Sequence, residues 1–543
     1  MEQFVTIFLL LIIISIFHFQ LGVLSSNTIP NQDTSYMNFV HEASELPEKE
    51  EYEYIVIGGG TAGCPLAATL SSKFSVLLLE RGSDPNKYPS VLNEQGLLNA
   101  FVAEDDGQNP FQHFTSEDGV ENLRGRVLGG GSMINAGFYS RGHREFFETA
   151  GVDWDMELVE KAYQWVEETV VSRPSLGAWQ SAFRSALLEA GVGPDNGFDL
   201  RHLVGTKTGG SIFDDKGNRH GAVELLNKAE PKNLKVATQA TVQRIIFDGL
   251  SASGVSYLDS KGKLHTAFIH KKGEIILSAG AIGSPQLLLL SGVGPKSHLL
   301  SLRLPVVLHQ PHVGGFMSDN PRLSPALVLP FQLVASSAQV VGTLDNNIHL
   351  QSFASPLPFF APPSFSLLPP QSTSIIPSLA IFVGKFSDVH SEGSLRLNSS
   401  TDVKNSPIVR FNYYSHPDDL ARCVRGVRKV GDLLTTQTME KMKTQDIEGN
   451  KGFQFLGLPL PENLWNDSSV EEYCQKTVTT YWHYHGGCLV GKVVDDNLKV
   501  IGIENLRVVD GSTFSVSPGT NPMATLMMLG RYVGLKVLQQ RSS

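Results

Sequence analysis

The sequence predicts an α/β fold built around a Rossmann-like sheet, and two observations carry that prediction. The first is a succession of apolar strand, glycine turn, helix and second strand between Glu53 and Gly82. The second is size, because 543 residues are enough for about two to four domains of ordinary length. With 41% hydrophobic and 18% charged residues, the chain is typical of a globular protein rather than a disordered one.

The glycine turn indicates a dinucleotide site. Tyr54–Ile57 is an unbroken apolar run, as in a central parallel strand, and the pattern G-x-G-x-x-G follows it as Gly58, Gly60 and Gly63. The first glycine permits the bend and the second lets the backbone approach a pyrophosphate. The third lets the helix beginning near Thr61 pack against the strand. We expect the phosphates at the N-terminus of that helix, where free N–H groups favour an anion.

The second strand ends in an acidic residue. Phe74–Leu79 is the predicted strand, and Glu80 follows it in the place where a carboxylate accepts hydrogen bonds from a ribose. A carboxylate there disfavours NADP, because a 2′-phosphate would meet a like charge. These residues alone leave FAD and NAD open.

Charge and the N-terminal segment bear on partners and location. A net charge of -10 and the lack of a basic stripe argue against nucleic acid as a partner. The apolar run Phe4–Phe17 is too short to span a bilayer comfortably and predicts a cleaved signal peptide over residues 1–26, with no stable membrane insertion afterwards. Glu2 and the absence of Lys or Arg before this run leave an uncleaved anchor as the alternative. The sequons at Asn398 and Asn466 fit a secretory route, so we expect an extracellular or vacuolar glycoprotein.

The chain has four cysteines and no CxxC pair, so we expect no metal site. In an oxidising compartment Cys423 and Cys474 could form a disulfide, which would stabilise the fold by about 4 kcal/mol in the chain-entropy model.

Five further motifs carry a family resemblance. They are RGRVLGGGSMINAGFYSRG (124–142), GEIILSAGAIGSPQLLLLSGVGP (273–295), YWHYHGGC (481–488), RVVDGS (507–512) and SPGTNPMATLMMLGRYVG (517–534). In this order they resemble the signatures of the glucose–methanol–choline (GMC) oxidoreductases. Within that family the chain is most similar to the plant (R)-mandelonitrile lyases and lyase-like flavoproteins. The resemblance covers nearly all of the chain after residue 50.

The resemblance implies FAD as the cofactor. Some relatives attach FAD covalently through a histidine where this chain has Ile134, so noncovalent binding is expected. The residues that we expect to hold FAD are Gly58, Gly60, Thr61, Ala62, Gly63, Glu80, Arg81, Val127, Gly130, Ser132, Asn135, Ala136, Gly137, Phe138, Val242, Trp482, His483, Asp510, Gly511, Pro522 and Met523.

The resemblance also implies two intertwined domains. One is the FAD-binding domain, and the other is an α+β substrate domain, or cap, with a mostly antiparallel sheet. We expect FAD-binding segments at 51–170, 231–315 and 481–543, and cap segments at 171–230 and 316–480. We further expect a monomer that binds a small-molecule substrate.

The expected chemistry is oxidation of a small, aromatic alcohol. His483 matches the family's catalytic histidine, and imidazole is suited to take a hydroxyl proton near neutral pH while hydride passes to the flavin N5. Asn521 occupies the second catalytic position, where the mandelonitrile lyases have histidine, and it can orient an oxygen but cannot titrate. Tyr481 and Gln351 are expected to contact the substrate.

Two alternatives stay open. The same site could cleave an aromatic cyanohydrin to an aldehyde and hydrogen cyanide without redox change, although Asn521 in place of a second imidazole weakens this interpretation. A protein that has lost catalysis and keeps FAD for structural reasons is the third hypothesis.

Overall fold

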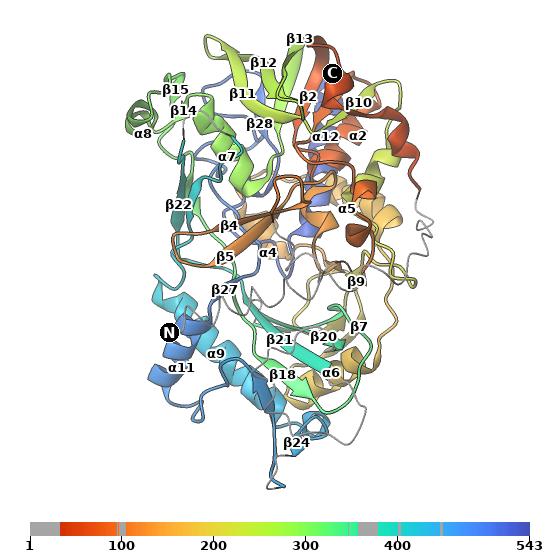
Figure 1. The fold of residues 1–543 in the computed structure, drawn as a ribbon, viewed down its shortest axis with the longest axis vertical. Coiled ribbons are helices and arrows are strands. Elements are labelled where there is room, and N and C mark those ends of the chain that lie inside the picture. Colours follow the sequence, from red (N-terminus) through yellow and green to blue (C-terminus); the bar gives the residue numbers. More distant parts are fainter. Residues whose placement is uncertain are drawn as a thin grey trace.

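The computed structural model describes residues 33–94, 96, 105–345, 347–356, 378–399, 403–445 and 449–542 (Figure 1). The predicted signal peptide lies outside these residues. Two large sheets dominate the fold, one in the upper and one in the lower half of the view. This arrangement confirms the predicted combination of a Rossmann-like domain and a second domain with its own sheet.

The first sheet has eight strands, ordered β1-β10-β3-β2-β13-β12-β11, with β28 beside β13. The neighbouring pairs β1–β10, β10–β3, β3–β2 and β2–β13 are parallel, and β28 is parallel to β13. The pairs β13–β12 and β12–β11 are antiparallel. β3 is buried along its whole length, as expected of a parallel strand covered on both faces. The strands are β1 (Val40–Glu42), β2 (Lys49–Ile57), β3 (Val76–Leu79), β10 (Leu234–Thr238), β11 (Thr241–Asp248), β12 (Ser251–Leu258), β13 (Leu264–Leu277) and β28 (Leu506–Val508).

The glycine turn lies where the sequence places it, with two shifts in the element boundaries. β2 begins at Lys49, earlier than the apolar run, because its first residues pair with the long strand β13. The following helix, α2, begins at Gly63 rather than near Thr61, since the turn occupies the residues in between. Helix α12 packs against α2 and α5, so the C-terminal segment completes this half of the molecule. The helices here are α2 (Gly63–Ser71), α4 (Arg144–Thr149), α5 (Met156–Val170), α7 (Gly280–Leu290), α8 (Lys296–Ser301) and α12 (Met523–Ser542).

The second sheet has nine strands, ordered β26-β18-β21-β20-β19-β8-β7, with β17 between β21 and β27. Apart from the parallel pair β7 and β8, the paired strands are antiparallel, as predicted. Helices α6 and α9 pack against its strands. The strands are β7 (Asp195–Phe198), β8 (Gly205–Thr208), β17 (Pro321–Leu323), β18 (Ala326–Leu329), β19 (Val340–Leu344), β20 (Ile348–Pro356), β21 (Ser378–Phe386), β26 (Gln454–Leu456) and β27 (Thr479–Thr480).

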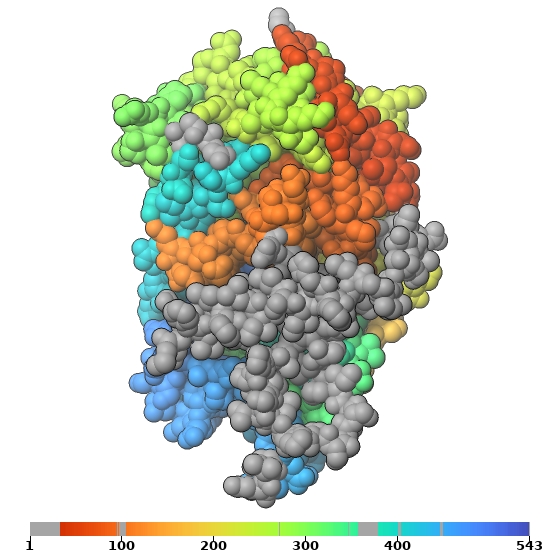
Figure 2. Space-filling view, in the orientation of Figure 1, coloured from red at the N-terminus to blue at the C-terminus, as the bar shows by residue number. Residues whose placement is uncertain are grey.

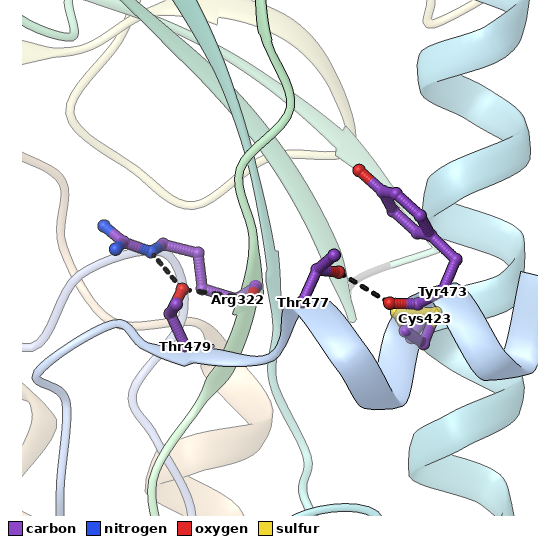
Figure 3. Close-up of a disulfide and its surroundings, with 6 residues drawn as sticks. Arg322, Cys423, Tyr473, Thr477 and Thr479 are labelled. Atoms are coloured by element: carbon purple, nitrogen blue, oxygen red, sulfur yellow. Dashed lines mark hydrogen bonds between the residues drawn. A yellow bond between two sulfur atoms is a disulfide. The ribbon is translucent and has the colours of Figure 1, made fainter. Parts of the chain in front are cut away.

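Three further helices belong to the lower half: α9 (Pro417–Leu434), α10 (Gln437–Glu440) and α11 (Asp467–Thr477), with α6 (Ala178–Glu189) beside them. A disulfide joins α9 to α11 through Cys423 and Cys474, with a Cα–Cα separation of 6.2 Å, and so confirms the predicted pair. Just after α11 ends at Thr477, Thr479 accepts a hydrogen bond from Arg322 Nε at 3.0 Å (Figure 3). The disulfide before residue 477 and this hydrogen bond after it therefore both hold the segment in place.

The remaining strands form small sheets of two or three strands. The hairpin of β4 and β5 and its flanks form the orange band across the middle of the surface in Figure 2. These strands are β4 (Phe111–Thr115), β5 (Glu121–Gly125), β6 (Phe138–Tyr139), β9 (Gly210–Ser211), β14 (Val293–Gly294), β15 (Leu308–His309), β16 (Gly315–Met317), β22 (Gly393–Arg396), β23 (Ile408–Arg410), β24 (Thr444–Gln445) and β25 (Lys451–Gly452). Among the described helices, none combines the length and the apolar character that a membrane crossing requires.

Candidate active site

A cavity of about 740 Å³ lies between the two sheets. The carboxyl ends of parallel strands form one wall, with Ile57, Leu79 and Ser278. The antiparallel sheet forms the opposite wall, with Gln351 and Val383. Ligands of open α/β sheets bind at such strand ends, so this is the expected place for a dinucleotide.

The glycine-rich segments leave room for a large planar or phosphorylated ligand. Gly130 has φ of +56°, and a Cβ there would lie 2.7 Å from the Cα of Gly60. The two loops therefore touch backbone to backbone across the cavity wall, and only glycine fits at position 130. Gly60 and Gly130 both line the cavity, so the structure fits the predicted phosphate-binding role of these loops.

Glu80 lies at the end of β3 with its carboxylate in the cavity wall. Its two oxygens accept hydrogen bonds from the backbone N–H groups of Gly59 at 2.9 Å and Gly82 at 2.7 Å. Burial raises the pKa of this carboxyl, while these two hydrogen bonds oppose the shift. Each oxygen keeps a second lone pair, so Glu80 can still accept a hydrogen bond from a ribose hydroxyl.

The second helix end at the cavity belongs to α12. Pro522 and Met523, at its start, line the cavity, as predicted for the end that carries the positive helix dipole. Asp510 also lines it, but its carboxylate accepts hydrogen bonds from Gly280 N and Ser512 N at 2.9 and 2.8 Å. Asp510 thus fixes the start of α7 as well as facing the cavity.

Most of the residues predicted to hold FAD or substrate line this one cavity. Three do not. A Cβ on Gly63 would lie 1.9 Å from the Gly58 carbonyl oxygen, so this glycine serves helix packing. Val127 is fully buried and bridges Ser83, and the Ser132 hydroxyl is taken by Gly129 O and Ala222 N. The predicted residues that line the cavity are Gly58, Gly60, Thr61, Ala62, Glu80, Arg81, Gly130, Asn135, Ala136, Gly137, Phe138, Val242, Gln351, Tyr481, Trp482, His483, Asp510, Gly511, Asn521, Pro522 and Met523.

The four residues predicted for chemistry and substrate contact form one chain of contacts. The Tyr481 hydroxyl donates to the Gln351 side-chain oxygen Oε1, and the Gln351 side-chain amide nitrogen donates to the Asn521 side-chain oxygen at 3.5 Å. The Asn521 amide nitrogen in turn lies 3.5 Å from His483 Nε2. Residues 170 positions apart in sequence therefore meet at one point of the cavity.

His483 has the properties of a neutral base. Burial, assisted by the positive charge of Lys385, holds the pKa of its imidazole well below the usual value of 6.5. Its Nδ1 atom has no hydrogen-bond partner in the part of the chain that the structure describes. A neutral imidazole in a cavity wall can accept a proton from a bound hydroxyl group.

The backbone that carries His483 is held by a buried carboxylate. Asp319 accepts hydrogen bonds from His483 N at 2.9 Å, from the Thr480 hydroxyl at 2.7 Å and from the Tyr413 hydroxyl at 2.6 Å. Burial raises the pKa of Asp319 to about 6. Between Thr480 and His483, Trp482 adopts a left-handed backbone with φ of +58°, a strained conformation for a bulky side chain.

A buried lysine fixes the loop that carries Asn521. Lys385 of β21 donates to the Thr520 carbonyl at 2.7 Å, to the Gly519 carbonyl and to the Ser517 hydroxyl at 3.3 Å. Burial holds the pKa of this ammonium well below 10.5. Neither Asp319 nor Lys385 was predicted from the sequence. Only Lys385 could have been noticed in the sequence, because it is the one charged residue in the apolar run of β21.

His485 lies two residues beyond His483 and contacts the same segment. Its ring Nδ1–H donates to the His483 carbonyl oxygen at 3.0 Å, and its backbone pairs with Ser318. These contacts add to those that fix the position of His483.

The parallel sheet, its glycine turn and the cavity at the strand ends define a dinucleotide-binding α/β fold. Solved structures share this fold. Pyridoxine 4-oxidase from Mesorbium loti superposes with a TM-score of 0.74 over 90% of this chain and 99% of that one, at 20% identity. A fungal aryl-alcohol oxidase superposes with a TM-score of 0.69 over 92% of this chain and 100% of that one, at 21% identity.

The chain belongs to the GMC oxidoreductase family. Two models described as GMC oxidoreductase match residues 52–322 and 389–530. A curated relative, (R)-mandelonitrile lyase 1 of Prunus serotina, is 51% identical over 95% of this chain and 92% of its own length. Another, sinalpyl alcohol oxidase Nec3 of Nesocodon mauritianus, is 52% identical over 96% of this chain and 95% of its own length. The family supports FAD as the cofactor.

Proposed function

We propose that this protein is an FAD-dependent oxidoreductase acting on the CH–OH group of a small, aromatic alcohol. The observation that carries the proposal is the pairing of a neutral imidazole, His483, with the amide of Asn521, which cannot titrate, at 3.5 Å. The apolar cavity walls near Gln351, including Phe353 and Ile381, suit an aromatic ring. The likeness to an alcohol oxidase at 52% identity points the same way.

Each residue has a defined role in this proposal. His483 Nε2 takes the hydroxyl proton, and the Asn521 amide orients the hydroxyl oxygen. Tyr481 and Gln351 hold Asn521 and face the substrate. When bound, FAD supplies the acceptor for the hydride that leaves the carbinol carbon.

We infer that FAD binds noncovalently. Ile134 lies in the cavity wall and has no atom that could form a bond to the cofactor. Denaturation should release all of the yellow colour into the supernatant, and colour that stays with the precipitated protein would contradict this inference.

The lyase reaction is the second candidate, favoured by 51% identity to a mandelonitrile lyase. Lys385 also supports it, because a buried positive charge near the site would stabilise a departing anion. Asn521 opposes it, since the amide supplies no proton.

Anaerobic mixing separates the candidates. A benzylic or cinnamyl alcohol should bleach the flavin absorbance of the wild-type protein, and His483→Ala should slow bleaching by about 100- to 10,000-fold. The matched control is His309→Ala, an exposed histidine on β15, which should bleach at the wild-type rate. Cyanide release from mandelonitrile with an unchanged flavin spectrum would instead establish the lyase. If no substrate in a broad panel bleaches the flavin or releases cyanide, both candidate functions are refuted.

We also infer passage through the secretory pathway. Both sequon asparagines, Asn398 and Asn466, are exposed, and the Cys423–Cys474 disulfide is the kind of bond that forms in oxidising compartments.

A further inference from the structure

Two histidines and two aspartates meet on the surface of the lower half, away from the cavity. His390 follows β21, and His416 and Asp418 lie at the start of α9. His390 Nδ1 lies 3.4 Å from Asp418 Oδ2, and His416 Nδ1 lies 3.7 Å from the same oxygen. In the described part of the chain, His390, His416 and Asp418 are the group whose ligand atoms all lie within 4.8 Å of one another.

We propose that His390, His416 and Asp418 bind one divalent metal ion of the zinc type. A tetrahedral zinc ion with bonds of about 2.1 Å holds its ligand atoms about 3.4 Å apart, close to the two distances that the structure shows. Two imidazoles and one carboxylate are ligands that suit zinc and copper. Water would complete the coordination, because the three side chains are 42%, 42% and 60% exposed.

The ligands are held on a rigid frame. The backbone N–H of His390 donates to the buried carboxylate of Asp419 at 3.1 Å, and the Ser391 hydroxyl donates to the same carboxylate at 2.6 Å. The backbone N–H of His416 donates to that Ser391 hydroxyl at 3.1 Å. Because one buried carboxylate and one hydroxyl fix the backbone of both histidines, ion binding needs to order only their side chains.

A second carboxylate lies behind the first ligand. Asp388 Oδ2 is 3.7 Å from Nε2 of His390, the ring nitrogen that faces away from Asp418. Asp388 is itself held by Arg422 at 3.0 Å. A carboxylate at the outer nitrogen of a metal-binding histidine orients the ring and makes it a stronger ligand.

One existing contact competes with the ion. The backbone N–H of Asp418 donates to His416 Nδ1 at 3.3 Å and caps α9. A metal ion at this nitrogen replaces one long hydrogen bond, which leaves the N–H group to water at the exposed helix end.

The test uses the mature, FAD-loaded glycoprotein, freed of any affinity tag and treated with a chelator. Titration calorimetry with zinc chloride should show one ion per chain. His390→Ala and His416→Ala should each weaken binding by about tenfold or more, and Asp388→Asn by about tenfold. The matched control is His270→Ala, which removes an exposed imidazole 3.5 Å from Glu51 without a third ligand, and it should leave the affinity unchanged.

Equal zinc affinity in wild type and in the His390 and His416 variants would overturn the proposal. So would an equal loss in His270→Ala. A second measurement does not depend on variants: the electron paramagnetic resonance spectrum of copper bound to the wild-type protein should show coupling to two imidazole nitrogens, and coupling to one or none would also overturn it. An unchanged flavin spectrum in each variant confirms that the fold is intact.

Discussion

Asp319 is the residue whose protonation we expect to control activity at acid pH. Thr480, Tyr413 and the His483 backbone all donate to it, so a proton on the carboxylate breaks one of these bonds. With its pKa raised to about 6, kcat/KM should fall as the pH drops through 6. Protonation of His483 should not lower kcat/KM in this pH range, because its lowered pKa keeps the imidazole neutral near pH 6.

The variant Asp319→Asn distinguishes an effect of protonating Asp319 from an effect of protonating His483. An amide has one acceptor oxygen at every pH, so turnover should be about tenfold lower and independent of pH between about 5 and 8. Measured pH profiles of kcat/KM decide this, and an acid limb that persists in Asp319→Asn would assign it to His483. Tyr413→Phe, which removes one donor only, serves as the milder control.

The same residues show where sequence reasoning ends. His483, Asn521 and the glycine turn were predicted because their roles are tied to short motifs in which neighbours in sequence are neighbours in space. Asp319 and Lys385 act on the catalytic segments from strands and loops more than 130 positions away, and only the tertiary pairing of β17, β21 and β27 brings them there. The packing role predicted for Gly63 from the glycine pattern agrees with the structure, in which a Cβ at this position would lie 1.9 Å from the Gly58 carbonyl oxygen.

At the scale of the element, α11 combines a helix cap with a sequon. Asn466 Oδ1 accepts from Ser469 N at 3.3 Å and caps the helix, while the side chain is exposed and can carry a glycan on its nitrogen. Asn466→Asp should remove the glycan and keep the cap. Asn466→Ala should remove both and cost about 1 kcal/mol in free energy of unfolding. Mass spectrometry and urea denaturation check this, and equal stability of the two variants would refute the capping role.

The disulfide stabilises the pair of helices α9 and α11. It closes a loop with a sequence separation of 51, so the double variant C423A/C474A should lose about 4 kcal/mol of unfolding free energy. Urea denaturation measures the loss. A reductant should lower the stability of the wild-type protein and leave that of the double variant unchanged; the opposite pattern would count against the bond.

At the scale of the whole molecule, FAD is expected to hold the two sheets together. Gly130→Ala places a Cβ 2.7 Å from Gly60, an overpacking that costs about 1–3 kcal/mol and should weaken FAD binding by about 10- to 100-fold. The ratio of absorbance at the flavin band to protein absorbance measures bound FAD. Gly452→Ala is the matched control, because no atom lies within 4 Å of a Cβ there. Full flavin content in Gly130→Ala would contradict the placement of the cofactor.

The chain order has a consequence for biosynthesis. β28, α12 and the segment that carries His483 and Asn521 all come from the last part of the chain, yet they complete the sheet and cavity that the first strands begin. A growing polypeptide on the ribosome therefore cannot close its cofactor site until the residues of α12 have been synthesised. Until then the earlier segments keep apolar surface uncovered, which favours aggregation during synthesis.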